Sequence, residues 1–469
     1  MKAIYFSLLM IFSIFSTVLS AQISIKQADN IIQEYIEKEI TEYYWLYSNE
    51  NIKADKSGVT TILIWNREFI SNDNSCFVYF IDEYPYANWE HPCRYLFVNK
   101  SNGQIHEKKA KTPPENLETW KMITPLPDVP ENIKFDFSKS TLNFRSGINP
   151  QNCYAVILSG GYDMGSNHER YWNDCEAIYS TLINVYSYLK NHIYVLISDG
   201  TDPANDRRRV NGIYDSSPLD LDGDGLPDIQ YAATKNNITT VFNTLSNILT
   251  SNDYLFIFTT DHGGTTSSGE AILYLWHETT TASEFAAEVN KVNAGEISIV
   301  MEQCYSGGFV PHLEKRGRTV ATACSATELS WSGLGMLYNE FVYHWTAAVR
   351  GYTPSGSSVN ADYNNDGYIS MKEAFDYANT HDNTKETPQY SSIKSYLGDC
   401  LTLRGRQIGT TVNSINQVVT TNTTITTCAN INVQDVNVQN GAKLILDAGG
   451  DVNIISNFEV KLGSELEIK

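Results

Sequence analysis

Between residues 150 and about 405, apolar runs of four to eight residues alternate with helix-length stretches whose apolar residues recur at helical spacing. Short apolar runs of this kind are typical of buried parallel strands, and their alternation with helices predicts a mostly parallel sheet with helices on both faces. The predicted strands are "CYAVILS", "HIYVLIS", "DYLFIFTT", "EISIVME" and "RTVATAC".

The two flanking parts of the chain are patterned differently. Apolar residues from Ile25 to Ile36 recur at helical spacing, and the strand-like runs "TTILIW", "SCFVYFI" and "CRYLFVN" follow them. We expect an α+β unit over residues 21–145, ending in the Pro-rich linker "KTPPENLETWKMITPLPDVPEN". We expect the α/β domain over 146–408, and the short alternating strands of 409–469 predict a small all-β module.

The first twenty residues read as a secretory signal. Lys2 is followed by an uncharged apolar run from Ile4 to Val18, and Val18, Leu19 and Ser20 are small enough for cleavage after Ser20. An uncleaved membrane anchor is the alternative. We therefore expect a secreted or cell-surface protein, and we expect the C-terminal module to serve anchoring or secretion.

Eight cysteines in an oxidising compartment should in part be paired. Cys76 and Cys93 are one candidate pair, because both lie in strand-like segments of one small region. Cys400 and Cys428 are a weaker candidate pair. The spacing alone does not fix the connectivity.

The formal net charge of −20 argues against nucleic acid as a partner, because the phosphate backbone would be repelled. Acidic loops suit hard cations instead. The run "DYNNDGYISMKE" matches an EF-hand calcium loop, with Gly367 at the turn position. Its expected ligands are Asp362, Asn364, Asp366, the carbonyl of Tyr368, Ser370 and Glu373.

A second acidic run, "DLDGDGLPD", is a shorter candidate calcium loop. It has no acid at its twelfth position, which is Tyr231, so an acidic solvated turn is the alternative. We expect calcium in both loops to stabilise structure, and we expect no catalytic cofactor. The candidate ligands are Asp220, Asp222, Asp224 and Asp228.

A histidine and a cysteine follow two of the predicted strands. His262 comes after a strand that ends at Thr260, and Cys304 comes after a strand that ends near Glu302. If the two strands are neighbours, the imidazole and the thiol lie side by side, as nucleophilic catalysis requires. We predict Cys304 as nucleophile, His262 as general base, and the N–H groups of Cys304 and Gly263 as oxyanion donors.

The runs "TTDHGG" and "MEQCYSGGF" resemble the His-Gly and Glu-x-Cys-x-Ser-Gly motifs of the legumain family of cysteine peptidases. The resemblance covers roughly residues 150–405. It implies a caspase-like fold, as in gingipains and separases, hydrolysis of peptide bonds in protein or peptide substrates, and release from a propeptide. The 21–145 unit is then the expected propeptide of a zymogen, with an unrelated binding module as the alternative.

The resemblance also implies a specificity pocket. Legumain-like enzymes have an Arg-His-x-x-Asp run whose arginine lines this pocket, and "ERYWND" places Arg170 and Asp174 at the same spacing, with Tyr171 in place of the histidine. A surface ion pair of Arg170 with a neighbouring acid is the alternative. The resemblance also suggests Asn167 as the residue that orients the catalytic histidine.

Three further pocket residues follow from the resemblance. Glu302 matches the family's glutamate two residues before the nucleophile, and "ELSW" offers Ser330 as a pocket residue and Trp331 as a wall. An arginine and a glutamate together present donors and an acceptor to one side chain, which favours cleavage after Asn or Asp. A basic preference as in gingipains, transpeptidation, and a non-catalytic calcium-binding surface protein are the alternatives.

Overall fold

The computed structural model describes residues 22–65, 68–126, 149–393, 396–407 and 409–469. The predicted signal sequence lies outside the described residues, and so does the end of the predicted linker at 127–148. No helix within the described ranges is long and apolar enough to cross a bilayer.

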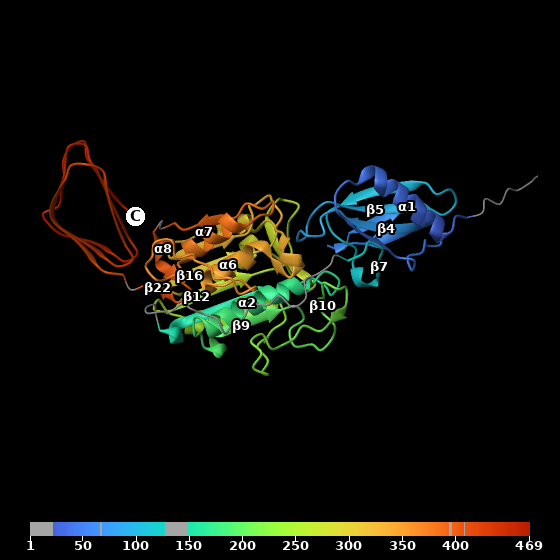
Figure 1. The fold of residues 1–469 in the computed structure, drawn as a ribbon, viewed down its shortest axis with the longest axis horizontal. Helices are drawn as coiled ribbons and strands as arrows, with labels where there is room; N and C mark the ends of the chain where they lie inside the picture. The colour runs from blue at the N-terminus through green and yellow to red at the C-terminus, as the bar shows by residue number, and fades with distance from the viewer. Residues whose placement is uncertain (1–21, 66–67, 127–148, 394–395, 408) are drawn as a thin grey trace, which may run out of the picture.

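A six-stranded sheet forms the centre of the molecule, in the order β20-β17-β16-β12-β8-β9 (Figure 1). Five of its strands are parallel, and only the edge strand β20 runs antiparallel. These five are the strands predicted from the sequence. The bounds of the five are β8 Cys153–Ser159, β9 Ile193–Ile197, β12 Tyr254–Thr259, β16 Glu296–Met301 and β17 Arg318–Thr322, and β20 comprises Gln389–Ser391.

Helices cover both faces of this sheet, as the alternating pattern predicts. Apolar residues of α2, α6 and α7 pack on one face, and those of α3 and α4 pack on the other. The middle strand β12 is buried along its whole length, because both of its faces are covered. The bounds are α2 Glu169–Asn184, α3 Lys235–Ile248, α4 Ala282–Val289, α6 Glu340–Arg350 and α7 Met371–His381.

The order of the strands reverses between β8 and β12. From β8 the chain moves outward to β9, and it then returns to place β12 on the other side of β8. In open α/β sheets, functional groups gather beyond the carboxyl ends of the strands at such a point. The segments after β8, β12 and β16 therefore meet there.

The N-terminal unit contains a five-stranded antiparallel sheet, in the order β6-β5-β4-β1-β7. Helix α1 (Ile25–Glu39) begins with a capping box of Ser24 and Gln27 and packs against one face. The other face shares an apolar cluster with the α/β domain, including Tyr162 and Tyr274. The strands are β1 Trp45–Ser48, β4 Cys76–Asp82, β5 Cys93–Asn99, β6 Ile105–Ala110 and β7 Lys121–Met122.

Residues 409–469, here called the C-terminal coil, wind so that strands of successive turns pair in parallel. They enclose a core of valine, leucine and other apolar residues. The strands are β23 Val412–Val419, β24 Thr423–Thr427, β25 Ile431–Val438, β26 Lys443–Ala448, β27 Val452–Ser456, β28 Glu459–Val460 and β29 Glu465–Ile468. In Figure 1 this coil and the N-terminal unit lie at opposite ends of the molecule.

Short elements complete the described chain. They are the strands β2 Thr60–Leu63, β3 Phe69–Asn72, β10 Arg207–Arg208, β11 Tyr214–Asp215, β13 Gly263–Thr265, β14 Ala271–Leu275, β15 Glu278–Thr281, β18 Ser332–Gly333, β19 Tyr338–Asn339, β21 Leu401–Thr402 and β22 Gly405–Arg406, and the helices α5 Val310–Leu313 and α8 Leu397–Cys400.

The structure corrects one of the two candidate cysteine pairs. Cys76 and Cys93 are both free, because β4 and β5 pair antiparallel and place Cys76 opposite Asn99 and Cys93 opposite Asp82, at opposite ends of the ladder. Cys400 and Cys428 form a disulfide, as the weaker candidate proposed. This bond ties the C-terminal coil to the α/β domain.

Reduction of the disulfide should destabilise the C-terminal coil. Cys400 and Cys428 are 28 residues apart, and closing a loop of that length is worth roughly 3.5 kcal/mol in the chain-entropy treatment. We expect dithiothreitol to make residues 403–430 sensitive to limited proteolysis. A Cys400→Ala/Cys428→Ala double variant should be sensitive without reductant and unaffected by it. Equal resistance in all samples would contradict this role.

Candidate active site

The parallel pairing of β12 and β16 brings His262 and Cys304 together. Thr259 pairs with Met301 at the carboxyl ends of the two strands, and each of the two functional residues lies three positions beyond its paired residue. Gly263 passes so close to the backbone of Cys304 that a Cβ atom there would collide with the Cys304 carbonyl. Glycine is therefore required where the two segments meet.

The thiol of Cys304 is completely buried and faces two segments of the chain. It donates to the carbonyl oxygen of Asn88, with a sulfur–oxygen distance of 3.0 Å, and it accepts from the N–H of Ser330 at 3.2 Å. Asn88 belongs to the loop between β4 and β5 of the N-terminal unit. A peptide carbonyl of the same chain thus contacts the predicted nucleophile.

The hydrogen bonds of His262 define its tautomer. Nε2 lies 2.8 Å from the carbonyl oxygen of Ser166, which only accepts, so Nε2 carries the proton. Nδ1 accepts from the N–H of Trp89 at 2.9 Å and is therefore unprotonated. The lone pair of Nδ1 therefore points to the amide nitrogen of the Asn88–Trp89 peptide bond, and the Tyr171 hydroxyl also lies 3.0 Å from Nδ1.

Burial keeps both groups neutral. Desolvation raises the pKa of the Cys304 thiol well above its usual value. Desolvation, with a smaller contribution from the positive charge of Arg170, lowers the pKa of His262 well below its usual value. With Asn88 and Trp89 in place, the two residues are a thiol and a neutral imidazole.

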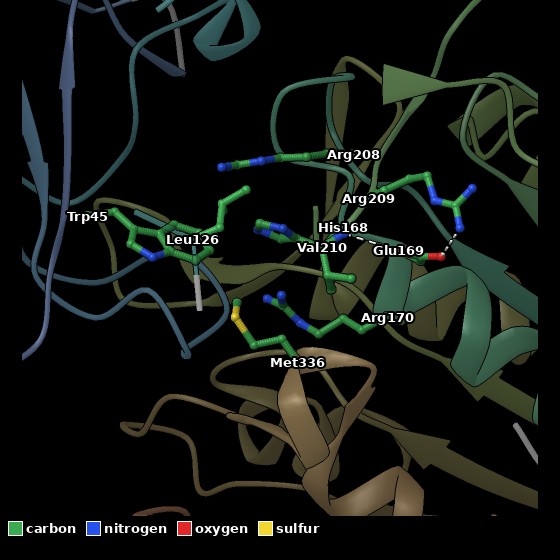
Figure 2. Close-up of a pocket in the computed structure, with 9 residues that line it drawn as sticks. All are labelled: Trp45, Leu126, His168, Glu169, Arg170, Arg208, Arg209, Val210 and Met336. Atoms are coloured by element: carbon green, nitrogen blue, oxygen red, sulfur yellow. Dashed lines mark hydrogen bonds and ion pairs between the residues drawn. The ribbon is translucent and has the colours of Figure 1, made fainter. Parts of the chain in front are cut away.

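Arg170 is buried in a pocket beside Cys304 and is not a surface ion pair. Its exposed fraction is 1%, and the neighbouring Glu169 pairs with Arg209 instead. Figure 2 shows the Arg170 side chain pointing toward Trp45 and Leu126 of the N-terminal unit, while Arg209 turns away to Glu169. A guanidinium without water around it requires hydrogen-bond acceptors.

The side chain of Asn88 supplies such an acceptor. Its Oδ1 accepts from Arg170 Nη2 at 2.6 Å and from the Tyr171 hydroxyl at 2.7 Å. Its Nδ2 donates to Ser330 Oγ at 2.8 Å and to Asn339 Oδ1 at 3.3 Å. The pocket therefore presents donors to the oxygen and acceptors to the nitrogen of one carboxamide group.

Asp174 and Asn339 position the pocket. The carboxylate of Asp174 accepts from Asn339 Nδ2 at 2.7 Å and from the Thr260 hydroxyl at 2.9 Å. This fixes the amide of Asn339 so that its Oδ1 faces Arg170 Nε at 3.1 Å. Burial raises the pKa of Asp174 to about 7, which its hydrogen bonds only partly offset.

Glu302, Trp331 and Gly263, which were also predicted for the site, do not hydrogen-bond to the Asn88 side chain within the described chain. Glu302 is completely buried, but no hydrogen bond joins it to Asn88 in the described chain, and burial raises its pKa well above the usual value. Trp331 contributes its backbone, which bridges antiparallel to Ala87. The N–H of Gly263 donates to the carbonyl of Trp89 at 2.7 Å.

Asn167 does not orient His262. Its Nδ2 donates to Ser198 Oγ at 2.6 Å and to the carbonyl of Asp206 at 2.7 Å, and the carbonyl of the preceding Ser166 holds the imidazole instead. The group that orients His262 is thus a backbone carbonyl, one residue before the asparagine predicted for this role.

The two acidic loops differ in what their carboxylates contact. Asp220, Asp222 and Asp224 offer oxygens within 4.8 Å of one another, but the ammonium of Lys190 already pairs with Asp222 at 2.6 Å and Asp224 at 2.7 Å. Asp228 is buried and bonds Tyr179 and the backbone.

The loop from Asp362 to Glu373 has the backbone that an EF-hand loop needs. Gly367 takes a φ of 87° at the turn position. The carboxylate of Asp362 accepts from the N–H groups of Asp366 and Gly367, which curls the loop around it. Glu373 accepts from Asn364 N–H and closes the loop, while it also caps helix α7 through Ser370. The backbone of this loop therefore has the course of an EF-hand loop, although among the described acids only Asp220, Asp222 and Asp224 bring three ligand oxygens within 4.8 Å of one another.

Sequence reasoning missed Asn88, Trp89 and Asn339, and it treated Tyr171 only as a departure from a motif. Asn88 and Asn339 lie 82 and 169 residues from Arg170. No local pattern marks either one, because twelve asparagines occur between residues 21 and 145 alone.

Comparison with known proteins identifies the family of the α/β domain. Residues 153–399 match the peptidase C13 family, over more than half of the chain. No curated protein matches. The crystal structure of protein GSU0716 from Geobacter sulfurreducens is similar at 11% identity and a TM-score of 0.34, over 51% of this chain and 92% of that chain. On the family match, the chain belongs to the peptidase C13 family, the legumain family of cysteine peptidases.

Proposed function

We propose that the chain is a secreted cysteine endopeptidase, made as a zymogen, that cleaves after asparagine through Cys304 and His262. The observation that carries the proposal is the hydrogen bonding of Asn88, whose side chain stands in for that of a substrate residue before the scissile bond. The Cys304 thiol lies at the carbonyl of this residue, and His262 Nδ1 lies at the following nitrogen.

These positions support a two-step reaction. His262 Nδ1 takes the thiol proton, and the Cys304 thiolate attacks the carbonyl carbon. The C–N bond breaks when His262 returns the proton to the leaving nitrogen, beside which Nδ1 already lies at 2.9 Å. A thioester remains, and water then cleaves it with the same imidazole as base. The N–H groups of Gly263 and Cys304 are the proposed donors to the oxyanion.

The pocket should favour asparagine over aspartate at neutral pH. An aspartate side chain would place an oxygen where Nδ2 of Asn88 donates to Asn339 Oδ1, and an amide oxygen has no proton to give. A lysine or arginine would meet the charge of Arg170 instead.

Calcium is proposed as a structural ligand of the loop from Asp362 to Glu373, with Asp362, Asn364, Asp366, Ser370, Glu373 and the carbonyl of Tyr368 as ligands. The fit of this backbone supports the site. A second site at Asp220, Asp222, Asp224 and Asp228 would require Lys190 to move aside. We also propose that the C-terminal coil serves anchoring at the cell surface or secretion.

Replacing the nucleophile should abolish turnover without unfolding the protein. In processed protein, we expect Cys304→Ala to lower kcat/KM by about 10⁴-fold or more for peptides with Asn before the cleaved bond. Cys324→Ala, a neighbouring buried thiol, is the matched control and should keep most activity. Activity retained in Cys304→Ala would disprove the role.

A substrate profile tests the pocket. We expect kcat/KM for Asn to exceed that for Asp by about tenfold at pH 7.5, because one buried hydrogen bond is lost. Peptides with Arg, Lys or Leu should be cut at least about 100-fold more slowly. A preference for basic residues would overturn the assignment of Arg170.

Tyr171 should matter for substrate and not only for stability. Tyr171→Phe removes the hydroxyl that donates to the carboxamide oxygen, so kcat/KM for Asn peptides should fall about tenfold. Tyr179→Phe, on the same helix, removes a buried hydroxyl bonded to Asp228 and should cost stability alone. Equal activity of the two variants would contradict the role of Tyr171.

Calcium removal can be tested with a matched pair of glutamates. Glu373 and Glu284 both cap helices from the third position, but only Glu373 lies in the candidate loop. We expect EDTA to lower the Tm of the wild type and of Glu284→Gln by several degrees and to leave Glu373→Gln nearly unchanged. An EDTA response equal in all three would exclude this loop as the calcium site.

A further inference from the structure

The loop between β4 and β5 places residues 86–90 in the active site, and these five residues are here called the blocking segment. It runs antiparallel to the segment of Ser330 to Ser332. Asn88 N–H donates to the Ser330 carbonyl at 2.9 Å, and Ser332 N–H donates to the Tyr86 carbonyl at 2.7 Å. A peptide that adds a strand in this way gains main-chain hydrogen bonds that do not depend on its sequence.

Contacts continue on the other side of the Asn88–Trp89 bond. Gly263 N–H donates to the Trp89 carbonyl, and the Tyr305 hydroxyl donates to the Glu90 carbonyl at 3.1 Å. The Glu90 side chain accepts from the Tyr274 hydroxyl. The blocking segment therefore occupies the site on both sides of the bond that would be cut.

One feature of the blocking segment differs from a reacting substrate. The Asn88 carbonyl oxygen is the atom that contacts the thiol, and it accepts a hydrogen bond from the thiol. The Gly263 N–H, an expected oxyanion donor, is bound to the carbonyl of the next residue, Trp89. The carbonyl that would have to become an oxyanion thus does not bond this donor, and attack loses that stabilisation.

The rest of the N-terminal unit holds the blocking segment in place. Trp65 lies 5.4 Å from the His262 ring and donates to Asp163 at 3.2 Å. Arg208 donates to the Tyr47 hydroxyl at 3.1 Å. Because the segment is tethered to the enzyme, its effective concentration at the site is high, on the order of millimolar.

We propose that the blocking segment is a built-in inhibitor of the active site, with Asn88 as its anchor in the carboxamide pocket. The proposal rests on the proposed function, since it uses the pocket for Asn that substrates would use. Removal of the N-terminal unit, by cleavage outside this segment, frees Cys304. The chain thus carries within itself a non-reacting analogue of its substrate.

The test compares uncut full-length wild type, Asn88→Ala, Asn88→Asp and the control Asn49→Ala. Asn49 lies in the same unit and bonds only groups of that unit. The first readout is the rate at which iodoacetamide labels Cys304, measured by peptide mapping, and it requires no substrate. The second readout is cleavage of an Asn peptide, with thermal unfolding as the check on folding.

We expect Cys304 to be nearly unlabelled in wild type and Asn49→Ala. Labelling and peptide cleavage should rise about 30-fold or more in Asn88→Ala, because Arg170 and its neighbours lose their partner. In Asn88→Asp, the rates of labelling and cleavage should rise less than in Asn88→Ala. This variant keeps the test usable if Asn88→Ala does not fold. Rates equal to wild type in both Asn88 variants would overturn the proposal.

Two further outcomes separate this proposal from the proposed function. If processed wild type does not cleave Asn peptides but the labelling rates differ as expected, the activity is wrong and the inhibitor stands. If wild type first cuts its own Asn88–Trp89 bond, as intact mass would show, the segment is a substrate and the inhibitor proposal fails.

Discussion

The buried guanidinium of Arg170 is the constraint on which the site depends. A charge removed from water is strongly destabilising unless acceptors surround it. Asn339 supplies one acceptor from the α/β domain, and the Asn88 carboxamide supplies another from a different part of the chain. Arg170 Nη2 and Nε thus gain an acceptor when a carboxamide enters the pocket, while Nη1 has no hydrogen-bond partner within the described chain.

The central sheet determines where this constraint acts. The carboxyl ends of β8, β12 and β16 lie side by side, so the segments that follow bring Arg170, His262 and Cys304 to one edge. Asp174, one helical turn after Arg170, fixes Asn339 and so the second acceptor. A single short stretch of α2 thus both lines the pocket and positions its opposite wall.

The strands, and the meeting of His262 and Cys304 at the carboxyl ends of two neighbouring strands, were predictable from sequence because the signals are local. Each strand is an apolar run, and His262 and Cys304 each lie three residues beyond the end of one. The partners of the pocket were not predictable, because Asn339 and Asn88 reach Arg170 only through the fold. The Cys76–Cys93 pairing was wrong for a related reason. In an antiparallel pair, the start of one strand lies beside the end of the other. Cys76 and Cys93 each start their strand, so they lie at opposite ends of the ladder.

A peptidase whose pocket binds carboxamides well is open to inhibition by any segment that presents one. On the proposed function, Asn88 uses the contacts that a substrate asparagine would use, so the pocket alone would not distinguish the blocking segment from a substrate. The difference between the blocking segment and a substrate lies in the backbone beyond the pocket. There the Gly263 N–H donates to the Trp89 carbonyl and not to the Asn88 carbonyl. We propose that a reacting substrate instead presents the carbonyl of its cleaved bond to the Gly263 N–H.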